Sequence, residues 1–206
     1  YGLQIKASVA PLWHDDVRFF DIRDAQGQLV GQFYLDMYAR NSKRGGAWMD
    51  DVITRRRLAT GIQTPVAYLN CNFSAPVGGK PAVFTHDEVI TLFHEFGHAL
   101  HALSSSVEYP GLNGGVRDYT EFHSQLLERW LLTPQVVDKY FRHYKTGEPM
   151  PQALIDKINK AATFNQGFAT VEFLGSAIMD MKYHITDPAG IDPRAFSDDM
   201  TEPPEV

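Results

Sequence analysis

The sequence contains almost no cysteine: Cys71 is the only one among 206 residues. A single cysteine cannot form a disulfide within the chain, so a fold held together by internal disulfides is excluded. Cys71 lies in an apolar run from Pro65 to Phe73, where a buried thiol is a commoner explanation than a reactive one. The sequence therefore favours a reducing compartment, and we expect a cytoplasmic protein.

Long apolar runs and a surplus of basic residues are also absent. No stretch approaches the roughly 18 uninterrupted apolar residues of a membrane span, and the N-terminus lacks the pattern of a signal peptide. The formal net charge is -6, and Lys and Arg are scattered rather than clustered, so the chain is not built to neutralise a phosphate backbone. The sequence thus predicts neither a membrane nor a nucleic acid as a partner.

The remaining composition is that of an ordinary globular protein, with 44% hydrophobic and 21% charged residues. A chain of this length suffices for one domain with its own core. We expect a single unit over 1–206, with a β-rich part over 1–84, a helical part over 85–186 and an irregular tail over 187–206. The first residue is Tyr1 rather than Met, so we also expect that N-terminal and C-terminal segments of a longer protein are missing.

Local patterns predict a few strands followed by helices. Alternating apolar residues over 17–22 and 29–38, with a turn between them, predict a hairpin, and 65–73 predicts a further strand. Thr85 and Glu88 form a capping box ahead of a helix over 85–104. After a glycine-rich loop, further helices are predicted over 119–132, 134–145, 151–162 and 164–184.

The run His94-Glu95-Phe96-Gly97-His98 has the H-E-x-x-H arrangement. On a helix, residues four apart lie on one face, so both imidazoles can bind one ion, while Glu95, about 100° round the helix, leans toward the metal's open position. Zinc suits this geometry, because a catalytic zinc ion takes three protein ligands and one water, whose pKa it lowers. A chance match has a probability on the order of 1% in a chain with eight histidines. We therefore predict His94 and His98 as ligands of one Zn²⁺ per chain, with Glu95 as general base.

A third ligand must come from outside the motif. His101 shares the helix face, but three ligands on one straight helix cannot surround an ion tetrahedrally, so we expect it in the outer shell of the site or in the core. Glu121 lies beyond the glycine loop, on a helix that can return beside the first, and is the predicted ligand. His123 would point about 200° away from Glu121, so the two cannot both be ligands. Asp118 and Glu128 are candidates to accept the free N–H of a ligand histidine, with a surface or structural carboxylate as the alternative for each.

Longer segments, namely 43–48, 65–73, 84–98, 117–125 and 164–168, resemble the thimet oligopeptidase family of zinc metallopeptidases, both its oligopeptidase A-like and its peptidyl-dipeptidase-like members. The resemblance covers nearly the whole chain. It implies hydrolysis of short peptides in a deep channel, the third zinc ligand at Glu121, and substrate contact at the glycine loop through Gly111, Gly114 and Gly115. The expected fold is α+β and mainly α-helical, a zincin-type catalytic core with a small β-sheet beside the H-E-x-x-H helix.

Some features depart from the family pattern. His123 stands where the family usually has proline, and Thr120 where it usually has a small or β-branched apolar residue. The family's oxyanion-stabilising histidine and tyrosines, and its large helical N-terminal half, have no counterpart in this chain. Two functions therefore stay open: a zinc peptidase, or a chain that binds zinc and peptide with little or no turnover. A non-peptidase zinc hydrolase is disfavoured, because the resemblance outside the motif is to peptidases.

Overall fold

A computed structural model describes residues 1–201, with side chains through residue 197. The chain divides into two compact units, one over residues 1–140 and one beginning at Phe141, and each is described by itself. The architecture is α+β, as expected. The prediction of a single unit over 1–206 stays a prediction.

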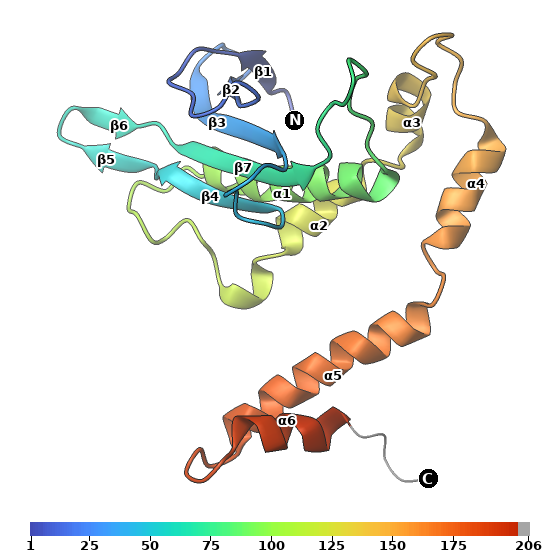
Figure 1. The fold of residues 1–206 in the computed structure, drawn as a ribbon. Coiled ribbons are helices and arrows are strands. Elements are labelled where there is room, and N and C mark those ends of the chain that lie inside the picture. Colours follow the sequence, from blue (N-terminus) through green and yellow to red (C-terminus); the bar gives the residue numbers. More distant parts are fainter. Residues whose placement is uncertain (202–206) are drawn as a thin grey trace. The chain divides into compact units, whose positions relative to one another are not determined.

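The first unit is built on a mixed five-stranded sheet. Its strand order is β1-β2-β3-β7-β4, and β3 and β7 run parallel, whereas the other neighbours are antiparallel (Figure 1). The strands are β1 (Gln4–Ala7), β2 (Arg18–Arg23), β3 (Leu29–Tyr38), β4 (Trp48–Ile53) and β7 (Val66–Phe73). A two-stranded ribbon, β5 (Arg56–Leu58) and β6 (Gly61–Gln63), lies between β4 and β7 in the sequence. The predicted hairpin and the predicted strand over 65–73 are confirmed.

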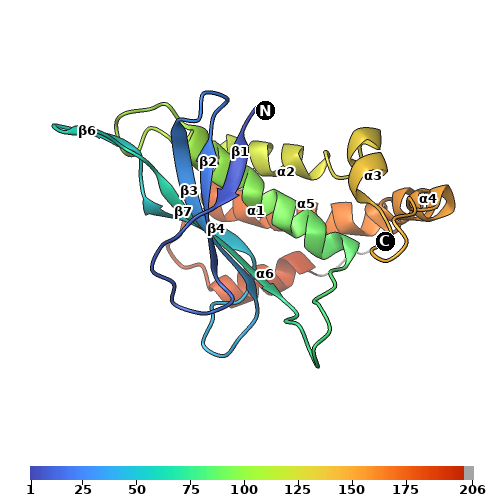
Figure 2. The ribbon, with the colours of Figure 1, turned by 90° about the horizontal axis from the view of Figure 1, so that it is seen from above.

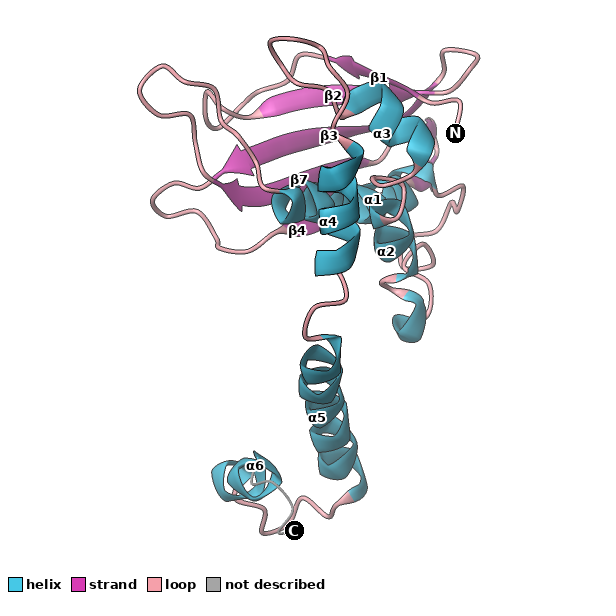
Figure 3. Ribbon diagram, turned by 90° about the vertical axis from the view of Figure 1, so that its right-hand side faces the viewer, coloured by secondary structure: helices cyan, strands magenta, loops and turns pink. Residues whose placement is uncertain are grey.

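Helix α1 (His86–Ser104) lies against one face of this sheet, as Figures 2 and 3 show from two sides. Both hydrogen bonds of the predicted capping box between Thr85 and Glu88 are present. Ala99 and Leu103 of the helix belong to the same buried cluster as Leu69 and Cys71 of β7. The helix that carries the H-E-x-x-H motif is therefore fixed on the sheet by the main hydrophobic core.

The thiol of Cys71 is fully buried in this cluster. Burial, with a smaller contribution from the negative charge of Glu95, raises the pKa of Cys71 to about 12. The thiolate, which is the reactive form, is therefore not populated near neutral pH. The expectation of a buried cysteine is confirmed.

The helix predicted over 119–132 is shorter in the structure. A 3-10 turn over Arg117–Tyr119 comes first, and α2 (Phe122–Glu128) follows and packs against α1. Beyond Glu128 the backbone N–H groups of Arg129, Trp130 and Leu131 bond to carbonyls three residues back. The chain thus tightens into a 3-10 pattern after α2, as is frequent at helix C-termini. Helix α3 then begins at Pro134 (Pro134–Tyr140), as predicted.

The second unit is helical. It contains α4 (Gln152–Ala161), α5 (Gln166–Ile185) and α6 (Pro193–Thr201). The tail over 187–206 was predicted to be irregular, and for 193–201 this is wrong. The side chain of Asp192 accepts hydrogen bonds from the backbone N–H groups of Arg194 and Ala195, so an Asp-Pro pair starts α6. Residues 202–206 lie outside the described residues.

No helix among the described residues has the length and apolar content that crossing a bilayer requires. This statement holds for α1 and α5, which are the longest helices described.

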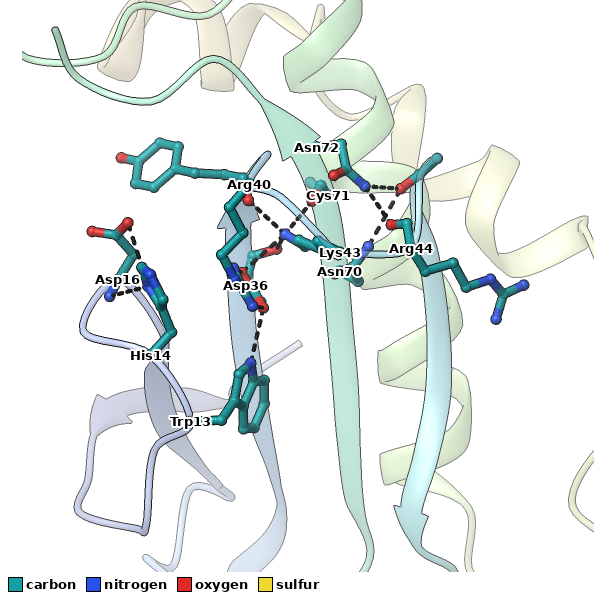
Figure 4. A network of polar contacts seen from close by, with 12 residues as sticks. Trp13, His14, Asp16, Asp36, Arg40, Lys43, Arg44, Asn70, Cys71 and Asn72 are labelled. Atoms are coloured by element: carbon teal, nitrogen blue, oxygen red, sulfur yellow. Dashed lines mark hydrogen bonds and ion pairs between the residues drawn. The ribbon is translucent and has the colours of Figure 1, made fainter.

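A buried carboxylate, Asp36 of β3, holds the loop after that strand (Figure 4). Its two oxygens accept hydrogen bonds from both terminal nitrogens of Arg40 at 2.7 and 2.6 Å, from Lys43 Nζ at 2.9 Å and from Trp13 Nε1 at 3.1 Å. Lys43 Nζ also donates to the carbonyls of Tyr38 and Cys71, so it ties the ends of the parallel strands β3 and β7 together. Burial alone would raise the pKa of Asp36, but the hydrogen bonds from Arg40, Lys43 and Trp13 outweigh it and lower the pKa to about 2.

Replacing Asp36 by Asn should destabilise the chain by roughly 3–5 kcal/mol at pH 7, because Arg40 and Lys43 then lose a buried counter-charge. The folded-state pKa lies below the unfolded value, so this stabilisation is complete above about pH 4 and is lost as the pH falls through the folded value of about 2. The gap between wild type and variant in urea unfolding should therefore close at low pH. Asp15→Asn, at an exposed position, is the control. A variant within about 0.5 kcal/mol of wild type at pH 7 would contradict the role given to Asp36.

Candidate metal centre

His94 and His98 lie one turn apart on α1 and face the same carboxylate. Their Nε2 atoms are each 3.1 Å from Oε2 of Glu121, and their ring centroids are 4.9 Å apart. One ligand atom from each of these three residues lies within 4.8 Å of the other two. The structure thus brings together the two histidines of the motif and the carboxylate predicted to join them.

Glu121 reaches the histidines because α1 and α2 approach closely at Gly97. A Cβ atom on Gly97 would lie 2.6 Å from Cα of Ser124 and 2.8 Å from the carbonyl oxygen of His123. Real Cβ atoms do not come so close to backbone, so no larger residue fits there without moving the helices. Gly97, the second variable position of the motif, therefore sets the distance between the two helices, and Glu121 at the N-cap of α2 faces α1.

Glu128, on the last turn of α2, contacts the far side of His94. Its Oε1 is 2.6 Å from Nδ1 of His94, and a carboxylate oxygen accepts hydrogen bonds, so this contact engages Nδ1, and Nε2 is the ring nitrogen that faces Glu121. Asp118, the other predicted partner of a ligand histidine, is exposed in the 3-10 turn. Within the described part of the chain, no hydrogen bond or ion pair joins Asp118 to His94 or His98.

The chemistry of these atoms fits a divalent metal ion. Nδ1 of His94 is engaged by Glu128, and its Nε2, the Nε2 of His98 and the Glu121 oxygen converge on the same point. Burial is the main cause that lowers the pKa of His98, which favours its neutral, ligating form. Two imidazole nitrogens and one carboxylate oxygen are a donor set that zinc takes at catalytic sites. A cation placed among the three groups would be within reach of a ligand atom from each.

Glu95, the remaining charged residue of the motif, is 7% exposed. Burial raises its pKa, the charge of His94 opposes this, and the charge of Glu121 adds to it. For Glu121 itself burial also raises the pKa, but the hydrogen bond from Ser124 and the two histidines outweigh it, and the net pKa is lowered. Glu121 is thus held in the ionised form in which a carboxylate binds metal.

His101 and His123 stack on each other instead of joining the three-residue group. Their ring centroids are 4.0 Å apart with 18° between the planes, and Nδ1 of His123 is buried without a hydrogen-bond partner among the described residues. Burial, with the charges of His123 and His98, lowers the pKa of His101. His101 was expected near the site or in the core, and it lies half-buried beside the site with no bond to a ligand histidine in the described structure.

The glycine loop joins α1 to the 3-10 turn. Gly111 and Gly115 have φ angles of +86° and +67°, which favour glycine, so both residues allow the backbone of the loop to turn. Gly115 lines a cavity of about 700 Å³ together with His101 and His123, whereas Gly111 and Gly114 are not among its lining residues. The substrate contact assigned to the three glycines stays a prediction.

The sequence reasoning did not single out Ser124. Its hydroxyl is fully buried and lies 2.9 Å from Oε2 of Glu121, the same oxygen that faces both histidines. The available signal was its spacing, because a serine three residues after a helix-start carboxylate lies on the same side of the first turn.

Comparison with known proteins decides the family. The sequence profile of peptidase family M3 matches residues 1–202. The chain belongs to peptidase family M3. It is 48% identical over 189 residues to "Oligopeptidase A" of Escherichia coli strain K12, an alignment that covers 89% of this chain and 28% of that protein. It is 44% identical over 179 residues to "Dipeptidyl carboxypeptidase" of Salmonella typhimurium, with 86% of this chain and 26% of that protein covered.

The M3 membership agrees with the expected resemblance to the thimet oligopeptidases, and a "Thimet-like oligopeptidase" of Dictyostelium discoideum is 34% identical over 197 residues, which cover 91% of this chain and 29% of that protein. The chain spans about a quarter of the length of the curated relatives it matches. What those proteins do as whole molecules is therefore not assigned to this chain by similarity alone.

Proposed function

We propose that this chain is the zinc-binding catalytic region of a peptidase that hydrolyses short oligopeptides. The observation that carries the proposal is the convergence of His94, His98 and Glu121 within 4.8 Å, with Glu95 buried in the same turn of α1. In this proposal the fold is a zincin-type core, the compartment is the cytoplasm, and the substrates are short peptides rather than folded proteins. The M3 membership and the names of the relatives support peptide hydrolysis.

The residues divide the work as follows. His94, His98 and Glu121 would hold the metal, and Glu128 orients the His94 ring through the contact with Nδ1 of that histidine. When bound, zinc supplies a Lewis acid and lowers the pKa of a water molecule. Glu95 accepts the proton of the attacking water and delivers it to the leaving amine, so no covalent intermediate with the protein is needed.

The second candidate is a chain that binds zinc and peptide but turns over little. The alignments cover only 28% and 26% of these two relatives. This favours the second candidate, because groups that stabilise the transition state can lie in the part of such proteins that is not aligned. Removing one oxyanion-stabilising donor typically costs about 100- to 1000-fold in rate. Both candidates predict that the chain binds zinc, and they differ only in the rate of peptide hydrolysis.

Metal analysis of the chain after incubation with zinc and dialysis tests what both candidates share. We expect about one zinc ion per chain, because one three-ligand group is present among the described residues. A folded chain that takes up no zinc would end the proposal. A quenched short peptide, assayed with and without a chelator, then separates the candidates: chelator-sensitive cleavage supports the peptidase, and zinc binding without cleavage supports the second candidate.

A further inference from the structure

The side chain of Glu121 is held in place by little packing. It is 53% exposed, whereas His94 and His98 are 25% and 18% exposed. A half-exposed glutamate has several accessible rotamers, and fixing one of them costs conformational entropy. The position of this carboxylate therefore requires a specific contact.

Ser124 supplies that contact. Its hydroxyl, fully buried, lies 2.9 Å from Oε2 and 3.0 Å from the backbone carbonyl oxygen of Glu121, so the donor is shared between the two acceptors. Oε2 is also the oxygen that faces both histidines at 3.1 Å. The hydrogen bond thus fixes the oxygen that points into the candidate metal centre.

The position of Ser124 is in turn set by the H-E-x-x-H helix. Its backbone lies against Gly97, where an added Cβ would come within 2.6 Å of its Cα. The absence of a side chain at Gly97 lets the backbone of Ser124 pack directly on α1, and its side chain is fully buried there. Gly97 therefore positions Ser124, and Ser124 positions the carboxylate of Glu121.

We propose that Ser124 is a positioning residue that preorganises Glu121 for metal binding. The inference rests on the proposed function, because it assumes that Glu121 is a ligand. Partners of metal ligands that act from the outer shell typically change metal affinity by about 10- to 100-fold. Loss of the Ser124 hydroxyl should weaken binding by that factor without removing a ligand.

The test is zinc affinity of the whole chain, measured by competition with a chromophoric chelator, for wild type and Ser124→Ala. We expect affinity lower by about 10- to 100-fold and a changed absorption spectrum of bound Co²⁺, since the carboxylate is no longer fixed. Ser104→Ala, at the exposed end of α1, is the matched control and should bind as wild type does. Equal affinity and an unchanged Co²⁺ spectrum in Ser124→Ala would overturn the inference.

A double-mutant cycle separates positioning from a general structural effect. In a Glu121→Gln background, Ser124→Ala should lower zinc affinity by less than about 3-fold, because the ligand that it positions is already lost. An undiminished effect in that background would show that Ser124 acts elsewhere and would overturn the inference. If Ser124→Ala does not fold, Ser124→Cys fills nearly the same space with a weaker donor and is expected to lose affinity in the same direction. Zinc binding by wild type with no loss in either variant defeats this inference alone, whereas no binding by folded wild type defeats the proposed function.

Discussion

Glu95→Gln is expected to leave the zinc affinity of the chain unchanged and to lower peptide hydrolysis by about 100- to 10,000-fold, the usual range for loss of a general acid–base group. Glutamine has nearly the same shape, so the buried position is still filled, but the amide does not accept the proton of the attacking water. The measurement is the cleavage rate of one quenched peptide, on this chain and on a longer protein that contains it. Metal content is determined on the same samples.

The control for this variant is Asp87→Asn, which neutralises an exposed carboxylate in the first turn of the same helix. It should change neither the zinc content nor the rate. If Glu95→Gln cleaves the peptide as fast as wild type does, Glu95 is not the base. If Glu95→Gln binds no zinc, Glu95 is needed for metal binding, and its assignment as a base that does not bind the metal is wrong.

The sequence predicts the elements with local signals well. The helix over 85–104 agrees with α1 (His86–Ser104) because the capping box and the apolar spacing are both local. Strands β1, β4, β5 and β6 were not predicted. They are short, and β4 carries two adjacent aspartates in place of an alternating pattern, so its pairing with β7 depends on residues distant in the sequence.

In the candidate site, too, the residues with a local sequence signal were predicted and those that depend on tertiary contacts were predicted less well. His94, Glu95 and His98 follow from spacing within one helix, and Glu121 from the chain reversal after the glycine loop. Asp118 and Glu128 were predicted on equal terms as partners of a ligand histidine, yet in the described part of the chain only Glu128 of the two contacts one. The reason is that Asp118 lies exposed in a 3-10 turn ahead of Glu121, whereas Glu128 lies on the last turn of α2.

Two further groups of contacts, around Asp36 and at Ser124, were not predicted because they depend on packing between segments. The bonds of Asp36 to Arg40, Lys43 and Trp13 join residues up to 23 positions apart, and no periodic pattern marks them. The bond from Ser124 to Glu121 is local, but its meaning depends on the close approach at Gly97. That approach joins two helices separated by the glycine loop, so spacing within one helix does not reveal it.

Glu121→Gln should weaken zinc binding by more than about 100-fold, because loss of a direct ligand exceeds the 10- to 100-fold typical of outer-shell partners. The neutral amide keeps the size of the side chain but has neither the charge nor the ligand strength of the carboxylate whose Oε2 faces both histidines at 3.1 Å. The affinity is measured by chelator competition on the whole chain. Folding is checked by urea unfolding of the metal-free form, where a half-exposed side chain should contribute little.

His123→Gln is the matched comparison, because His123 lies two residues after Glu121 and is the imidazole that competes with it for the role of third ligand. In the structure His123 stacks on His101 at 4.0 Å and is absent from the three-residue group, so the variant should bind zinc within about 3-fold of wild type. The opposite pattern, with binding lost in His123→Gln and kept in Glu121→Gln, would move the third ligand to His123. It would leave His94, His98 and the peptidase proposal intact, because a histidine in place of the carboxylate also completes a three-ligand catalytic zinc site.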